Sequence, residues 1–210
     1  MNKQFKRMIE ITGVVFVAMI LIVTFGMHQT EHAATTSSSS SSSYSSSSEK
    51  ASTTKTSSVM NKVNWQKSSE KVAYPDLTKY PNAWIHVSLA KNRTYIMNGN
   101  DVLYTMYCST GSGGDNATPT GTYYIQAERG TSFYSAKSGE GANYWVSWKD
   151  HGTYLFHTVP VDANGNYVLS EAKELGKESN SHGCVRLSVP DAKWIYDNVP
   201  EGMKVSITEN

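Results

Sequence analysis

Cysteine is scarce in this chain. Its 210 residues include only two cysteines, Cys108 and Cys184. Two cysteines can form at most one bond, so a disulfide framework is excluded. We expect both thiols to be free, because a thiol that acts in catalysis must stay unbonded.

The sequence also lacks an excess of charge of either sign. It has 19 Lys and Arg against 18 Asp and Glu, which gives a formal net charge of +1. It contains no run rich in Lys and Arg and no RNA-binding aromatic motif. We therefore expect no nucleic-acid partner.

One long apolar run is present near the start. Residues 11–27 carry no charge, and Lys3, Lys6 and Arg7 precede them. A membrane-spanning helix needs about 17–25 apolar residues. The flank of such a helix that carries more Lys and Arg usually lies on the cytoplasmic side. We expect residues 1–10 to be cytoplasmic and residues 11–27 to be a single transmembrane helix, with a cleaved signal peptide as the alternative. Either way, the remainder of the chain is exported.

The next two segments lack the pattern of a folded domain. Residues 28–58 are rich in Ser and Thr and include unbroken serine runs at 37–43 and 45–48. Such a segment has no apolar face to bury, so we expect a disordered tether. Whether this tether carries O-linked sugars is a question that the sequence leaves open. Residues 59–82 form a transitional segment to which the sequence assigns no fold.

Residues 83–208 have the pattern of a mainly β domain. Short β-branched and aromatic segments separated by turn residues favour a sandwich or a barrel. Helical signals are few, and one of them combines Ser188 with Asp191 three residues later, as in a capping box. We expect strands at 84–89, 94–97, 102–109, 122–127, 144–149, 153–158 and 204–208, and short helices at 170–175 and 188–198.

The stretch Ser181-His182-Gly183-Cys184 contains the parts of an acyl-transfer site. A thiolate attacks carbonyl carbon, a glycine turn can direct N–H groups at an oxyanion, and the arginine fork of Arg186 suits a carboxylate. A structural cysteine in a turn is the alternative. A cysteine nucleophile also needs a histidine, and His157 at the end of a strand is the best-placed candidate.

His157, followed downstream by residues 181–184, resembles the signature of the L,D-transpeptidase (YkuD) family. The Ser-Thr-Gly at 109–111, the Thr-Pro-Thr-Gly-Thr-Tyr at 118–123 and Arg186-Leu187 before a helix resemble further motifs of that family. The resemblance covers roughly residues 84–208. It implies a sandwich-like L,D-transpeptidase catalytic fold that acts on peptidoglycan stem peptides outside the cell membrane, in a Gram-positive-type envelope.

The resemblance also implies roles for individual residues. Cys184 is the nucleophile, and His157, oriented by a backbone carbonyl, is the proton acceptor and donor. Ser181, His182 and Gly183 shape the loop and its oxyanion site, and Arg186 braces the loop or meets a substrate carboxylate. The implied reaction converts a tetrapeptide stem into a 3→3 cross-link through a thioester and releases D-Ala, with no cofactor.

Three points stay open in the sequence. The 23 residues of segment 158–180 exceed the usual gap of the family, and they form either a lid or an inert excursion. Water as acceptor would make an L,D-carboxypeptidase, and a protein amine would make a wall-attachment enzyme. A non-catalytic wall-binding module is the alternative of a different class. A metal site is not expected, because His157, His182 and Cys184 lack the usual ligand spacing.

Overall fold

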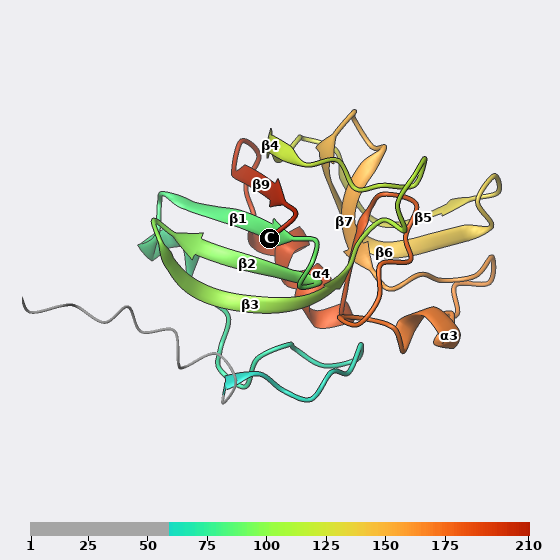
Figure 1. Ribbon diagram of the computed structural model, residues 1–210, viewed down its shortest axis with the longest axis horizontal. Helices are drawn as coiled ribbons and strands as arrows, with labels where there is room; N and C mark the ends of the chain where they lie inside the picture. The colour runs from blue at the N-terminus through green and yellow to red at the C-terminus, as the bar shows by residue number, and fades with distance from the viewer. Residues whose placement is uncertain (1–58) are drawn as a thin grey trace, which may run out of the picture. The chain divides into compact units, whose positions relative to one another are not determined.

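The computed structural model describes residues 59–210, in which nine strands form one curled sheet. The order across the sheet is β4-β9-β1-β2-β3-β8-β7-β6-β5 (Figure 1). The strands are β1 (Ala83–Ser88), β2 (Arg93–Asn98), β3 (Asp101–Ser109), β4 (Gly121–Tyr124), β5 (Arg129–Ser135), β6 (Glu140–Lys149), β7 (Tyr154–Thr158), β8 (Val185–Leu187) and β9 (Lys204–Thr208).

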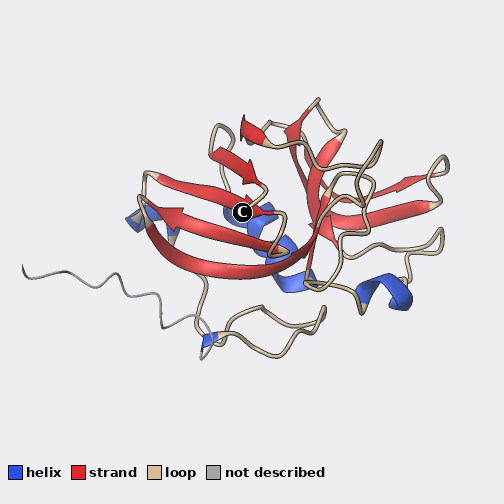
Figure 2. Cartoon of the chain, in the orientation of Figure 1, coloured by secondary structure: helices blue, strands red, loops and turns tan. Residues whose placement is uncertain are grey.

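Helices are few, as the sequence predicts (Figure 2). They are the 3₁₀-helix η1 (Leu77–Lys79), α3 (Leu169–Ala172) and α4 (Val189–Asn198). The Ser188 hydroxyl accepts a hydrogen bond from the Asp191 N–H at 3.2 Å, so the predicted N-cap of α4 is confirmed. The Asp191 carboxylate does not complete a capping box, because it binds elsewhere.

The sheet curls because the segment after β4 forms hydrogen bonds near both edges of the sheet. The Ile125 N–H donates to Met203 O at 2.9 Å, and the Gln126 N–H donates to Ser147 O of β6 at 2.8 Å. The strands therefore wrap around one core as a single curled sheet. The prediction of a mainly β fold with two short helices is confirmed.

The core lies inside the curl, against one face of α4. Figure 1 shows α4 between the β1–β3 group and the β5–β7 group. Trp194 and Ile195 of α4 join a buried cluster that includes Ile85, Trp148 and Phe156. Full burial of such a side chain contributes about 1.5–3 kcal/mol, so this cluster provides the main stabilisation of the sheet.

The strands β5 and β8 were absent from the sequence prediction. β5 is largely polar and has no fully buried residue, so its sequence carries no apolar alternation. β8 has three residues, all buried, which is too short to display a period. Both form because a neighbouring strand supplies their hydrogen bonds, β6 for β5 and both β3 and β7 for β8.

Residues 59–82 pack against the sheet through side chains that bond to its backbone. The N–H groups of Thr105 and Tyr107 in β3 donate to Glu70 Oε1 and Ser69 Oγ, both at 2.8 Å. The buried Asp191 carboxylate accepts from Ser69 Oγ at 2.5 Å and from the Tyr74 hydroxyl at 2.6 Å. This segment thus covers an edge of β3 that β8 leaves unpaired and fastens it to α4.

Within residues 59–210, no helix has both the length and the apolar character that crossing a membrane requires. The predicted transmembrane helix at 11–27 and the tether at 28–58 lie outside the described residues.

We predict that Asp191→Ala lowers the free energy of unfolding by about 2–4 kcal/mol, since it leaves the buried hydroxyl of Ser69 and the half-buried hydroxyl of Tyr74 without their acceptor. Asp197→Ala is the matched control, because Asp197 on the same helix makes only an exposed pair with Lys193. Urea unfolding of both variants tests this, and equal small losses would contradict it.

Candidate active site

The loop that carries Cys184 is closed by its own serine. Ser181 Oγ donates to Cys184 O at 2.6 Å and accepts from the Gly183 N–H at 3.1 Å. Gly183 has a φ of 115°, and a Cβ there would lie 2.8 Å from the Tyr154 ring. Only glycine fits this conformation and this close approach, which gives Ser181 and Gly183 their predicted part in shaping the loop.

The two upstream motifs support this loop from beneath. Thr118 Oγ1 donates to Gly183 O at 2.9 Å and accepts from the Gly111 N–H at 2.8 Å. The Ser181 N–H donates to Thr110 O at 2.9 Å. The segments 109–111 and 118–123 therefore hold the backbone of the loop, and neither contributes a residue to the cavity in front of Cys184.

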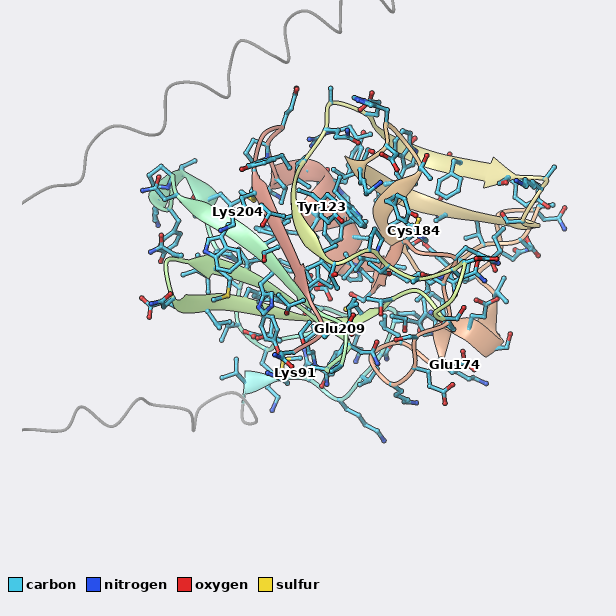
Figure 3. The ribbon with its side chains drawn as sticks, turned by 45° about the horizontal axis from the view of Figure 1, so that its top comes forward. Lys91, Tyr123, Glu174, Cys184, Lys204 and Glu209 are labelled. Carbon is cyan, nitrogen blue, oxygen red and sulfur yellow. The ribbon has the colours of Figure 1, made fainter. Side chains whose placement is uncertain are left out.

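Cys184 and His157 line one cavity of about 290 Å³ at the β5–β7 end of the sheet. Figure 3 labels Cys184 near these strands. Its walls come from the β5–β6 hairpin, the β6–β7 turn, β7 and the cysteine loop. The lining residues are Phe133, Ser135, Ser138, Glu140, Gly141, Gly152, Thr153, Leu155, His157, Ser181, His182, Cys184 and Arg186.

His157 is buried on β7, directly beside β8 in a parallel pair that aligns it with Arg186. Its Nδ1 lies 2.6 Å from Thr158 O, and a carbonyl can only accept. The proton of the neutral ring is therefore on Nδ1, which leaves the Nε2 lone pair free to accept a proton. The ring also meets the Phe133 ring edge-on, with centroids 5.8 Å apart.

The imidazole of His157 is neutral at pH 7. Burial lowers its pKa to about 3, and the positive charge of Arg186 acts in the same direction, against the opposing hydrogen bond to Thr158 O. Its side chain is a proton acceptor in the resting site, and not a cation that stabilises a thiolate.

The thiol of Cys184 is also neutral. Burial raises its pKa to about 11, and the Glu140 carboxylate raises it further, while the Leu155 N–H and Arg186 oppose them. Its Sγ donates to Thr153 O at 3.6 Å, as a protonated thiol does. The site therefore holds a neutral thiol and a neutral base, so a nucleophilic attack by this thiol would require a coupled proton transfer.

Arg186 braces the site from within the protein. Its side chain is only 2% exposed, and its Nη2 donates to Glu140 Oε2 of β6 at 2.7 Å. Its Nη1 bonds to Glu171 of α3 and, at 3.1 Å, to Asn180 O. Of the two predicted roles, bracing is the one these contacts support, although the buried Nε has no partner among the described residues.

The segment 158–180 is neither a lid nor an inert excursion. It contributes no residue to the cavity lining. Asp162 accepts from the Asn164 and Asn166 N–H groups in a tight turn, and Glu171 and Asn180 hold Arg186. The additional residues therefore form part of the brace beneath the loop that carries Cys184.

His182 lies at the mouth of the cavity. It is exposed, and its Nδ1 is 3.7 Å from Glu140 Oε2. No sequence pattern pointed to Glu140, which follows a turn more than 40 residues before Cys184. Phe133 was missed for the same reason, since strand pairing brings β5 to the cavity. Thr118 lies in the loop before β4, and the sequence motif at 118–123 did not reveal its hydrogen bonds to Gly111 and Gly183.

The remaining candidates lie elsewhere in the molecule. Cys108 is a buried thiol on β3 whose pKa is raised to about 12 by burial, and it is free, as the sequence predicts. His86 bonds to Thr208 Oγ1, and His151 pairs with Glu128. Among residues 59–210, no group of three or more His, Cys, Asp or Glu side chains is placed to hold a metal ion.

We predict that alkylation of Cys184 by iodoacetamide accelerates about tenfold per pH unit from pH 7 to beyond pH 9, because only the thiolate reacts. The alkylation rate of a thiol with an ordinary pKa would already level off near pH 9. Mass spectrometry of a Cys108→Ser variant isolates the signal of Cys184. A rate that is already constant between pH 6 and 8 would show a thiolate at rest and contradict the neutral thiol.

Comparison with known proteins places this site in a family. A family model for the L,D-transpeptidase catalytic domain (YkuD) matches residues 82–207. The curated protein named putative L,D-transpeptidase YciB, from Bacillus subtilis strain 168, is 46% identical over 148 residues, which cover 70% of this chain and 75% of that protein.

Two solved structures align with this chain at lower identity. The L,D-transpeptidase LdtMt1 in complex with imipenem aligns with a TM-score of 0.50 and 19% identity, over 60% of this chain and 59% of that one. A Clostridium acetobutylicum ATCC 824 protein, titled a fused Zn-dependent amidase/peptidase/peptidoglycan-binding domain-containing protein, aligns with a TM-score of 0.46 and 31% identity, over 60% of this chain and 52% of that one. The chain thus spans between half and two thirds of these two structures. By its family-model match and its curated relative, the chain belongs to the L,D-transpeptidase (YkuD) catalytic-domain family.

Proposed function

We propose that this protein is an L,D-transpeptidase that forms 3→3 cross-links between peptidoglycan stems, with Cys184 as nucleophile and His157 as general acid and base. The observation that carries the proposal is the pairing of a thiol and a buried imidazole in one cavity, with Nδ1 held by Thr158 O. A base oriented in this way has one free nitrogen, which is the arrangement that acyl transfer requires.

In the first half-reaction, Cys184 Sγ attacks the carbonyl carbon of the third residue of a tetrapeptide stem. His157 Nε2 accepts the thiol proton as the S–C bond forms. The C–N bond to D-Ala then breaks, and the imidazolium returns the proton to the leaving amine. A thioester on Cys184 and free D-Ala result.

In the second half-reaction, the side-chain amine of a neighbouring stem attacks the thioester carbonyl. His157 Nε2 accepts a proton from this amine, the C–S bond breaks, and the proton passes to the departing sulfur. The product is an amide between the third residues of two stems, and the enzyme returns to its neutral resting state.

The oxyanion of each tetrahedral intermediate requires backbone donors near Sγ. The Gly183 N–H donates to Ser181 Oγ in the resting loop, so it is occupied. The amides of His182 and Cys184, on either side, are the donors we assign to the oxyanion. His182 also stands at the entrance, where it contacts the substrate.

We further propose that residues 11–27 hold the protein in the cell membrane as a single-pass helix, with residues 28–58 as a tether. This arrangement would place the catalytic domain outside, within reach of the wall of a Gram-positive-type envelope. The proposal rests on the apolar run, on the basic residues before it, and on the serine runs that follow.

The reaction is tested by mass spectrometry of the full chain, in a mild detergent, with purified disaccharide-tetrapeptide. We predict an acyl-enzyme on Cys184, release of D-Ala and a cross-linked dimer. Cys184→Ala should abolish all three, and His157→Ala should slow acylation about 10²–10⁴-fold, the usual contribution of general base catalysis.

The other outcomes separate the alternatives. Release of D-Ala without dimer would identify a carboxypeptidase. The absence of any acyl-enzyme, with stems that carry either lysine or diaminopimelate, would contradict the enzyme and leave a wall-binding module.

A further inference from the structure

The charges around Arg186 do not balance. One buried guanidinium bonds to two carboxylates, Glu140 on β6 and Glu171 on α3. A single positive charge compensates only one of them, so the cluster keeps an excess negative charge. No Lys lines the adjoining cavity, and its only Arg is Arg186 itself.

The two carboxylates differ in what they face. Glu140 lines the cavity of Cys184, whereas Glu171 does not. The Glu140 side chain is 24% exposed, so it can still accept hydrogen bonds from a molecule in the cavity. The other titratable groups that line the cavity with Glu140 are His157, which is neutral, His182 at its mouth, and Cys184.

A carboxylate in this position works against the nucleophile. Its charge raises the pKa of the Cys184 thiol, which disfavours the thiolate. Bracing alone does not require this position, since Glu171 braces the same guanidinium from outside the cavity. The cavity-facing carboxylate therefore calls for a second role that involves the contents of the cavity.

We propose that Glu140 is a subsite for an alkylammonium group, namely the side-chain amine of the diamino acid in a peptidoglycan stem. A carboxylate and an ammonium group form a charge-assisted hydrogen bond, the strongest polar contact this cavity can offer. The inference rests on the proposed function, because it names what that site selects.

The amine can come from either stem. If it belongs to the acceptor, Glu140 holds it near the thioester, and the ammonium releases one proton to water before it attacks. If it belongs to the donor, Glu140 positions the stem for attack by Cys184. The acceptor amine and the donor amine would form the same ion pair with Glu140. The two cases are distinguished by which half-reaction, acylation or cross-linking, depends on Glu140.

The test compares Glu140→Gln with Glu171→Gln in the full chain, with disaccharide-tetrapeptide as substrate. Each variant removes one carboxylate from Arg186 and keeps an oxygen that can accept its hydrogen bond, but only Glu140→Gln changes the cavity. The measured quantities are the rate of acyl-enzyme formation and the ratio of dimer to hydrolysed tripeptide.

For an acceptor amine, we expect Glu140→Gln to lower the dimer-to-tripeptide ratio about 10- to 100-fold with acylation not slowed, as expected for the loss of a charge-assisted bond. For a donor amine, we expect acylation to fall by that factor, and acetylation of the donor amine should slow the wild type to the same rate. Loss of the Glu140 charge favours the thiolate, so slower acylation cannot arise from the thiol.

Glu171→Gln removes a partner of Arg186 without changing the cavity, so it measures what weaker bracing alone does to both quantities. If the two variants behave alike while the wild type cross-links, Glu140 is only a brace and the inference is wrong. If the wild type forms no acyl-enzyme, the proposed function fails, and the inference fails with it.

Discussion

The burial of one guanidinium is the constraint on which the catalytic loop depends. A charge inside a protein is tolerated only when partners replace its water, and Arg186 finds them on β6, on α3 and at Asn180. These partners belong to segments far apart in the sequence. Because Arg186 lies two residues after Cys184 and beside His157 in the sheet, the same contacts that satisfy the charge also fix the reacting groups.

The chemistry of the site follows from its burial. Removal of water lowers the pKa of His157 and raises that of Cys184, so both groups are uncharged at neutral pH. A site of this kind has no permanent ion pair to supply a thiolate. It depends instead on an imidazole whose proton is fixed on Nδ1 by Thr158 O, which keeps the other nitrogen available at the moment of attack.

The sequence predicted what short-range patterns encode. The motif at 181–184, the strand-end His157 and the Ser188 cap could each be recognised from a few neighbouring residues. The contacts of Glu140, Thr118 and Glu171 could not, because these residues lie 13 to 66 residues before Cys184. Glu140 and Glu171 reach its loop through Arg186, and Thr118 reaches it through Gly183 O. β5 was missed because its partner strand, and not its own composition, holds it. The curl depends on bonds from residues 125–128, which have no sequence signature.

The central claim is that the resting pair is neutral, with the imidazole proton of His157 on Nδ1. Nitrogen NMR of the full chain labelled in its histidines, with His157→Gln to assign the signal, tests this directly. The account predicts a neutral Nδ1–H ring at pH 7 that gains a second proton only near pH 3. A doubly protonated ring at pH 7 that becomes neutral in Cys184→Ala would reveal a thiolate–imidazolium pair and contradict the account.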